Sequence, residues 1–217
     1  MDVSLATIVL WAVPVVFAIT LHEAAHGYVA KLFGDQTAWM LGRVTANPIK
    51  HIDPIGTILV PGILLLFAKF GGPGFIFGWA KPVPVNFANL RNPKRDMFWV
   101  AGAGPAANFA MAIVWGFLLK AASPGGPVAS DGFMEMAGAG IQINLMLMAL
   151  NLLPIPPLDG GRIAVSLLPH SMAAGFARME PYGFIIVIVL LATGVLIQLM
   201  RPILAVAEYV LTAILGL

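Results

Sequence analysis

An apolar run from Leu5 to Leu21 leads directly into the pentapeptide HEAAH at residues 22–26. A run of this length can cross a bilayer as a helix, because a helix hydrogen-bonds its backbone polar groups within the segment. Ionisable side chains are costly at the end of an apolar segment, so their presence there requires a role. The combination predicts a membrane helix with a polar, chemically active end.

The composition of the 217-residue chain indicates a lipid environment. Hydrophobic residues make up 59% of the sequence and charged residues 10%, whereas soluble domains carry about 25% charged residues. The chain therefore has too few charges to cover a soluble surface. Its basic residues lie near the ends of apolar segments, which fits membrane topology rather than nucleic-acid binding. The absence of cysteine excludes disulfides and thiolate ligands.

The expected fold class is an all-α polytopic membrane protein with four to six transmembrane helices. A single membrane-embedded domain is expected over residues 1–217, with a catalytic core at about 3–168 and C-terminal helices at about 181–217. Arg201-Pro202 is expected to interrupt the C-terminal span and to start a short last helix. The long helices are expected at residues 3–33, 96–120, 134–153 and 182–200.

Short strands or a re-entrant element are expected between the first and third helical segments. Residues 41–52 combine β-branched side chains with Gly, Asn and Pro, which favours short strands. Residues 55–70 are apolar but short for a span, so a re-entrant or hairpin segment fits as well as a spanning helix. Residues 75–86 favour an extended strand, with one edge blocked by Pro82 and Pro84.

The distribution of basic residues predicts the orientation in the membrane. If residues 34–54 and 71–95 are cytosolic and the next two spans cross normally, nine of the twelve Lys and Arg residues lie inside. The N-terminus is then outside and the HEAAH end of the first helix lies nearer the cytosol. The N-terminus lacks the basic region of a signal peptide, so the first helix is expected to be retained. The nine residues are Lys31, Arg43, Lys50, Lys81, Arg91, Lys94, Arg95, Arg162 and Arg178.

The HEAAH sequence has the spacing of a zinc-binding motif. His22 and His26 are four residues apart, so both project from one face of a helix and can bind one Zn²⁺. Glu23 is adjacent to the first ligand, where it can act as general base on water activated by the metal. The alternative is a polar cluster that packs the helix.

Two histidines do not complete a catalytic zinc site, which uses three protein ligands and one open position. The third histidine of the soluble type is missing, because Leu32 stands six residues after His26. Asp159 is a candidate ligand: prolines end the apolar helix before it and Gly160-Gly161 follows, so its carboxylate can turn back into the bundle. Alternatively, Asp159 caps the N-terminus of a helix.

These motifs together resemble the site-2 protease family of intramembrane zinc metalloproteases. Its paired signatures are similar to HEAAHG at residues 22–27 and LDG at 158–160, and GPAAN at 104–108 resembles the motif on the intervening helix. GWAKPVPVN at 78–86 resembles a short bacterial or archaeal branch without PDZ or CBS domains. The resemblance extends from about residue 18 to residue 165. It implies a prokaryotic cell membrane as the location and a transmembrane protein or peptide as the substrate.

The resemblance also implies roles for individual residues. His22, His26 and Asp159 would bind one zinc ion. Glu23 would be the general base and later the proton donor. Asn151 would hold the substrate or stabilise the oxyanion, since an amide N–H in a dry site is a good donor to developing negative charge. A hydrogen bond between helices is the alternative role of Asn151.

Val83, Val85 and Asn108 are candidates for substrate contact. A substrate helix must unwind before cleavage, and the extended segment could then pair with the expected strand at Val83 and Val85. The Gly-Pro context of Asn108 suggests either shaping of the site or close helix packing. His51 and His170 lie in loop-like contexts and are interpreted as ordinary polar residues.

The expected function is hydrolysis of peptide bonds in or near transmembrane segments. One alternative is a membrane metal transporter, but transport does not require Glu23, and the sequence has no ladder of further acidic or histidine residues. The other alternative is an inactive relative that binds transmembrane helices, which is expected to have lost Glu23 or a ligand. The expected partners are a transmembrane substrate and the lipid bilayer, without nucleic acid.

Overall fold

The computed structural model describes residues 5–60, 62–63, 66, 78 and 80–216. Regular secondary structure within these residues is entirely helical, and no strand occurs among them. The α-helices are α1 (Leu5–Leu32), α2 (Thr37–Met40), α4 (Pro93–Ala122), α5 (Asp131–Asn151), α6 (Asp159–Leu167), α7 (His170–Ala177), α8 (Glu180–Ala192) and α9 (Val195–Leu215). The 3₁₀-helices η1 (Pro48–His51) and η3 (Phe87–Asn89) and the π-helix η2 (Pro54–Leu59) connect them.

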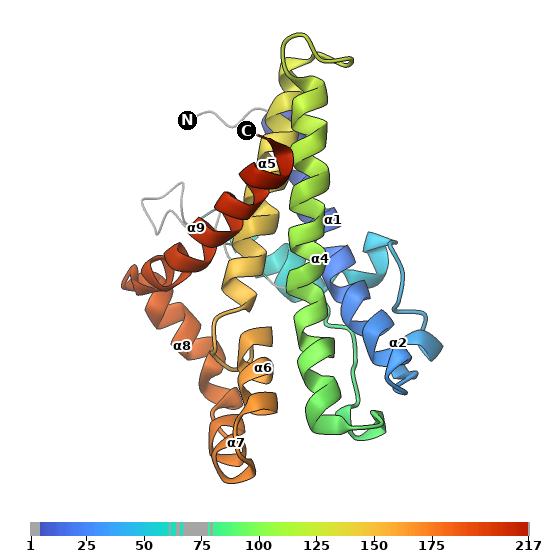
Figure 1. The fold of residues 1–217 in the computed structure, drawn as a ribbon, viewed down its shortest axis with the longest axis vertical. Helices are drawn as coiled ribbons and strands as arrows, with labels where there is room; N and C mark the ends of the chain where they lie inside the picture. The colour runs from blue at the N-terminus through green and yellow to red at the C-terminus, as the bar shows by residue number, and fades with distance from the viewer. Residues whose placement is uncertain (1–4, 61, 64–65, 67–77, 79, 217) are drawn as a thin grey trace.

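Helices α1, α4 and α5 pack against one another and form the body of the molecule. Helices α4 and α5 run as a hairpin along the long axis, and α9 crosses back toward them from the end occupied by α6, α7 and α8 (Figure 1). Small residues permit close approach: a Cβ on Gly140 would overlap the Trp115 ring, and one on Gly116 would overlap Leu215. Small residues at helix contacts are typical of membrane bundles.

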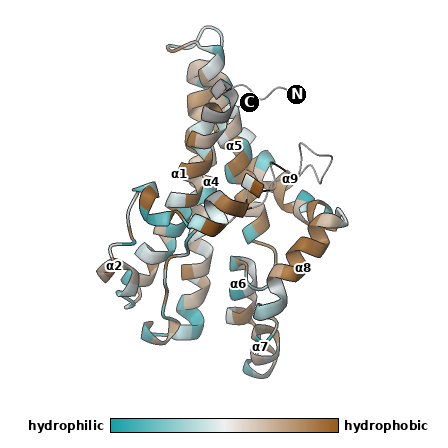
Figure 2. Ribbon diagram, turned by 180° about the vertical axis from the view of Figure 1, so that it is seen from behind, coloured by the Kyte–Doolittle hydropathy of each residue, from teal (hydrophilic) through white to brown (hydrophobic). Residues whose placement is uncertain are grey.

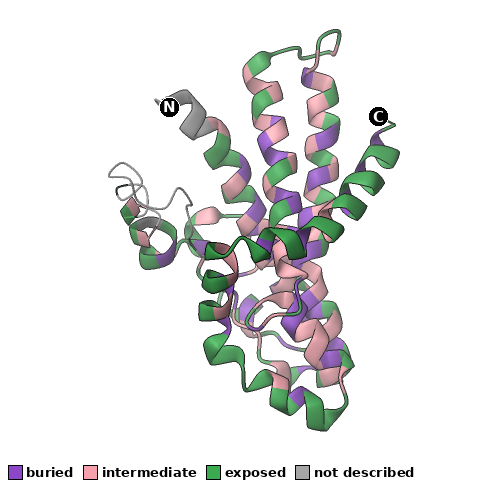
Figure 3. Cartoon of the chain, turned by 90° about the vertical axis from the view of Figure 1, so that its left-hand side faces the viewer, coloured by how far each residue is buried: buried purple, intermediate pink, exposed green. Residues whose placement is uncertain are grey.

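Burial is concentrated where α1, α4 and α5 face one another. Buried positions gather on these facing sides, whereas the helix that ends at the C-terminus is largely exposed (Figure 3). Thr20, Asn108 and Asn144 are fully or almost fully buried in this body. Because buried polar groups need hydrogen-bond partners, these side chains mark a polar centre inside an otherwise apolar bundle.

Several helices are suited to a membrane environment. Helices α4, α5 and α9 are long and apolar enough to cross a bilayer, and the pair α7 and α8, bent by 65°, would make a fourth span. Apolar residues dominate α8 (Figure 2). The all-α class is confirmed, and the described residues contain three or four candidate spans, which reach the lower limit of the predicted four to six only if the bent pair is counted as one span.

The predicted long helices are found with small shifts of their ends, except in the C-terminal region. There the interruption lies at Gly194, with φ +74°, instead of at Arg201-Pro202. Glycine enters the left-handed region without steric cost, so it separates α8 from α9. Helix α9 continues through Pro202, as membrane helices tolerate proline where neighbouring groups satisfy the backbone.

The strands predicted between the first and third helical segments are absent from the described residues. Asn47 instead accepts a hydrogen bond from Ile49 N–H and caps η1, and Asp53 accepts from the N–H groups of Ile55 and Gly56 at the start of η2. Local capping therefore competes successfully with strand pairing here. Much of 55–70, together with residues 75–77 and 79, lies outside the described residues.

Residues 81–86, called here the anchored segment, are held by side chains instead of a neighbouring strand. Arg43 donates to the carbonyl oxygen of Lys81 at 2.8 Å, and Asp35 accepts from Asn86 N–H at 2.7 Å. The N–H of Lys81 donates to the backbone carbonyl of His51 at 2.9 Å. The predicted strand at 75–86 is wrong for its described part, because long-range side-chain contacts satisfy the backbone that a strand would pair.

Candidate metal centre

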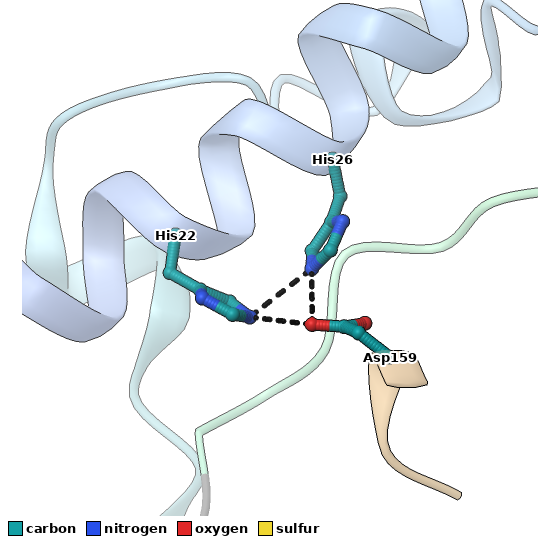
Figure 4. Close-up of side chains that lie close together, drawn as sticks. All are labelled: His22, His26 and Asp159. Atoms are coloured by element: carbon teal, nitrogen blue, oxygen red, sulfur yellow. Dashed lines mark hydrogen bonds and ion pairs between the residues drawn. The ribbon is translucent and has the colours of Figure 1, made fainter. Parts of the chain in front are cut away.

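Two helices bring three metal-ligating side chains together. Helix α1 presents His22 and His26 on one face, and Asp159 is the first residue of α6 (Figure 4). The two Nε2 atoms lie 3.1 Å apart, and they lie 3.2 and 3.3 Å from Asp159 Oδ2. All three side chains are at least 85% buried, so the cluster is an internal site.

Two glycines allow α6 to fold back against the end of α5. A Cβ on Gly160 would overlap the carbonyl oxygen of Leu153, and one on Gly161 would lie 2.7 Å from Pro156 N. Any larger residue would push α6 away from the preceding turn. The Gly-Gly pair thus permits the close approach that carries Asp159 toward α1.

Hydrogen bonds on the outer side of each imidazole determine which nitrogen faces the cluster. His22 Nδ1 lies 2.6 Å from Asn108 Oδ1, and His26 Nδ1 lies 2.7 Å from the carbonyl oxygen of Val100. A carbonyl oxygen only accepts, so each Nδ1 carries the hydrogen and each neutral ring directs the Nε2 lone pair inward. Asp159 Oδ2 has no hydrogen-bond donor. Three electron-pair donors thus converge, an arrangement that a cation stabilises.

The spacing of the three donor atoms fits a tetrahedral ion. Ligands about 2.0–2.1 Å from a tetrahedral zinc lie about 3.3–3.4 Å from one another, close to the 3.1–3.3 Å found here. Helix α4 approaches the donors through Gly104, where a Cβ would overlap His26 Nε2 and lie 2.6 Å from His22 Nε2. The residues present are therefore able to hold a metal ion.

The electrostatic environment of Asp159 also suits metal binding. Burial alone would raise the pKa of this carboxyl, but hydrogen bonds from His22 and His26 and their positive charge, present when a proton instead of a metal occupies Nε2, hold its pKa well below the ordinary range. The carboxylate is consequently ionised, which is the form that binds a metal.

Glu23 is held by a single backbone donor from the anchored segment. Its Oε2 accepts a hydrogen bond from Val83 N–H at 2.7 Å. Val83 stands between Pro82 and Pro84, neither of which has an N–H, so this tripeptide offers one donor and directs it to Glu23. Gly27 brings the segment close to α1, since a Cβ there would lie 3.0 Å from Val83 Cγ1.

Two cavities meet at the cluster. A cavity of about 170 Å³ is lined by the three candidate ligands, Glu23 and Asn151, and a larger one of about 630 Å³ leads away between α1, α5 and α8. Asn151 lines both cavities, and its Nδ2 donates to the carbonyl oxygen of Leu147 at 3.0 Å. The walls of the larger cavity are mainly apolar: Ile19, Leu147, Leu150, Phe184 and Val187.

Comparison with known proteins identifies the family. The profile described as Peptidase family M50 matches residues 118–194. The chain is 42% identical over 185 residues to the "Putative zinc metalloprotease YwhC" of Bacillus subtilis, covering 83% of this chain and 79% of the relative. The chain belongs to peptidase family M50. The resemblance to the site-2 proteases is thereby confirmed, and the assignment as a zinc metalloprotease with it.

Two further M50 relatives extend the comparison. The "Putative zinc metalloprotease Rip2" of Mycolicibacterium smegmatis is 34% identical over 180 residues, covering 82% of this chain and 65% of the relative. The "Putative zinc metalloprotease MJ0611" of Methanocaldococcus jannaschii is 28% identical over 145 residues, covering 65% and 62%. The chain thus spans slightly less than two thirds of these two relatives. No solved structure matches it significantly.

The M50 fold brings most of the residues chosen from sequence to one place. Glu23, Asn151, Val83 and Val85 line the same cavity as the three candidate ligands. Asn108 does not line either of the two cavities at the cluster but lies behind His22. His51 is buried and its Nε2 lies 3.1 Å from the carbonyl oxygen of Thr45, away from the cluster.

Three residues around the site, Asp35, Arg43 and Asn144, were not predicted from the sequence. Asp35 and Arg43 anchor the segment that reaches Glu23, and Asn144 contacts Asn108. A signal existed for Asn144, because an amide within an apolar helix requires a partner. The roles of Asp35 and Arg43 had no comparable signal, since their partners are backbone groups distant in sequence.

Proposed function

We propose that this M50 chain hydrolyses peptide bonds in or near transmembrane segments, with one zinc ion held by His22, His26 and Asp159. The observation that carries the proposal is the convergence of three ionised or lone-pair donors at tetrahedral spacing, directly beside Glu23. A zinc ion held by these residues would supply Lewis acidity, which would lower the pKa of a water molecule and polarise a substrate carbonyl. Three protein ligands leave one position for water or substrate.

Glu23 is proposed as the general base and later the proton donor. Val83 N–H holds Oε2, which leaves Oε1 to accept a proton from water and to return it to the leaving amine. A carboxylate held on one oxygen cannot rotate away from the cavity. The anchored segment therefore fixes the direction of proton transfer.

Asn151 is proposed to stabilise the developing negative charge on the substrate carbonyl oxygen. Its amide already donates one hydrogen to Leu147 O. The second hydrogen of the same NH₂ group is then available to the substrate. The position of Asn151 on both cavities supports this role, because the scissile bond must pass between them.

The larger cavity is proposed to receive an unwound apolar segment of the substrate. Its apolar walls suit transmembrane side chains, and Glu23 and Asn151 are part of its lining. Val83 and Val85 form the wall of the site at the metal end and are proposed to contact the substrate. We also propose a prokaryotic cell membrane as the location, with the N-terminus outside and the metal site nearer the cytosol.

A reconstituted cleavage assay tests this function. The wild type and Glu23→Gln are compared on a synthetic transmembrane peptide in liposomes, with zinc content measured for both. We expect one zinc per chain in each protein and cleavage only in the wild type, because the glutamine cannot accept the proton. Zinc bound by a wild type that cleaves no transmembrane peptide would favour the helix-binding alternative, and a well-folded wild type without zinc would refute the proposal.

A further inference from the structure

Asn144 is a fully buried side chain in α5 that lines neither of the two cavities at the metal cluster. Its Oδ1 accepts a hydrogen bond from Asn108 Nδ2 at 2.9 Å, and its Nδ2 donates to the carbonyl oxygen of Gly140 at 2.8 Å. Asn108, itself fully buried in α4, faces His22 with its Oδ1. Three side chains from three helices therefore form one continuous chain that ends at the metal cluster.

Each amide in this chain can have only one orientation. Gly140 O only accepts, so the NH₂ group of Asn144 must face it and Oδ1 must face Asn108. Asn108 Nδ2 lies between two acceptors, Asn144 Oδ1 and the carbonyl oxygen of Ala18 at 3.2 Å. A flipped amide at either position would place donor against donor or acceptor against acceptor.

The orientation of Asn108 determines the tautomer of His22. Because Asn108 presents Oδ1 at 2.6 Å, His22 Nδ1 must carry the hydrogen and Nε2 must present its lone pair to the cluster. His26 has the same tautomer because its Nδ1 donates to the backbone carbonyl oxygen of Val100, which cannot rotate as a side chain can. His22 depends on a side chain that can rotate, and Asn144 opposes that rotation together with the carbonyl oxygen of Ala18.

We propose that Asn144 is a positioning residue for the metal site, which it preorganises by locking Asn108 and thus the tautomer and ring orientation of His22. The inference rests on the proposed metal site but not on proteolysis. Partners behind a metal ligand typically change metal affinity 10–100-fold. The competing explanation is that the two asparagines only join helices α4 and α5, as amides do in membrane bundles.

Zinc affinity measured with a competing chelator, without any substrate, separates the two explanations. We expect Asn108→Leu to weaken zinc binding about 100-fold and Asn144→Leu about tenfold, since Ala18 O still orients Asn108 in the second variant. The double variant should bind no more weakly than Asn108→Leu alone, because Asn144 acts through Asn108. Asn144→Asp, which in its neutral form keeps both hydrogen bonds, should restore affinity to within about twofold of wild type.

Gln142→Leu is the matched control, since it makes the same kind of change in α5 and lines a different cavity, between α5 and α9. It should leave zinc affinity unchanged. In the apo protein, ¹⁵N shifts of the histidine rings should show one His22 tautomer in the wild type and a mixture in Asn144→Leu. The proposal would be overturned if a folded Asn144→Leu protein bound zinc as tightly as the wild type, or if the loss of zinc affinity in the double variant equalled the product of the two single losses. A wild type that binds no zinc would instead refute the metal site itself.

Discussion

The two halves of the candidate centre are built in different ways. The proposed ligand half consists of His22, His26 and Asp159, which stand on helices packed through glycine and buried amides. The proposed base half consists of Glu23 and the anchored segment, which pairs with no strand among the described residues. One half relies on helix packing, and the other on a few side chains that reach across long stretches of sequence.

This difference fits the different requirements of a metal ligand and a general base. A metal ligand must stay within a fraction of an ångström of its position, and helices with buried hydrogen-bonded neighbours provide that rigidity. A general base beside a substrate cavity must be oriented but also has to tolerate a peptide that comes and goes. A single N–H donor on an irregular segment provides orientation with less constraint.

The largest expected effect is the loss of a ligand. Asp159→Ala should reduce zinc affinity more than about 100-fold, beyond the effect of any residue behind the ligands. Zinc content after dialysis against a weak chelator measures this. Asp131→Ala, at the exposed start of α5, is the control and should retain zinc. Full zinc content in Asp159→Ala would remove Asp159 from the ligand set.

Gly104 tests the ligand half through its packing. Gly104→Ala should weaken zinc binding about 100-fold, because the new Cβ would displace the His22 and His26 rings from the cluster. Gly102→Ala is a matched control in the same helix, with no atom within 4 Å of its added Cβ. Equal zinc affinities in the two variants would contradict the close approach of α4.

Val83 tests the base half. Val83→Pro removes the N–H that holds Glu23. We expect kcat to fall about tenfold with zinc content unchanged, because the Glu23 carboxylate is still present as a base but is no longer held in position. Steady-state cleavage combined with metal analysis measures both. Val85→Pro distinguishes this role from strand pairing with the substrate. A loss of kcat only in Val83→Pro supports orientation of Glu23, whereas an equal loss of kcat in both variants supports pairing with the substrate.

The smallest expected effect concerns the anchor of the base half. Asp35 is fully buried; burial would raise its pKa, but hydrogen bonds from Thr37, Asn86 N–H and Asn89 lower that pKa below the ordinary value. Asp35→Asn should lower the stability at pH 7 by about 1–2 kcal/mol, because an amide cannot accept all these bonds. Thermal unfolding in detergent micelles measures the difference.

The pH dependence of this difference has a defined sign. A carboxyl with a lowered folded-state pKa contributes its full stability above the unfolded pKa of about 3.9 and loses it as the pH falls through the folded value. The gap between wild type and Asp35→Asn should therefore shrink below about pH 4. A gap that stays constant from pH 7 to pH 3 would show that the ionised carboxylate is not the source of the stability.

Regular helices and the metal-binding pattern were predictable because their signals are local. Apolar runs correctly located α1, α4 and α5, and the four-residue spacing placed His22 and His26 on one helical face. The predicted strand at 75–86 failed because its composition suits extended backbone but does not show what that backbone will contact. The break at Gly194 was missed because Pro202 was the stronger local signal, although proline is tolerated in a membrane helix.

By itself, the sequence determined that the chain belongs in lipid, which segments are helical and which residue types could bind a metal. These follow from composition, periodicity and spacing over a few residues. Only the tertiary structure decided that Val83 N–H meets Glu23, 60 positions away, and that Asn144 and Asn108 stand behind His22. The physical reason is that orienting hydrogen bonds depend on atoms brought together by helix packing, and spacing along the chain does not encode that packing.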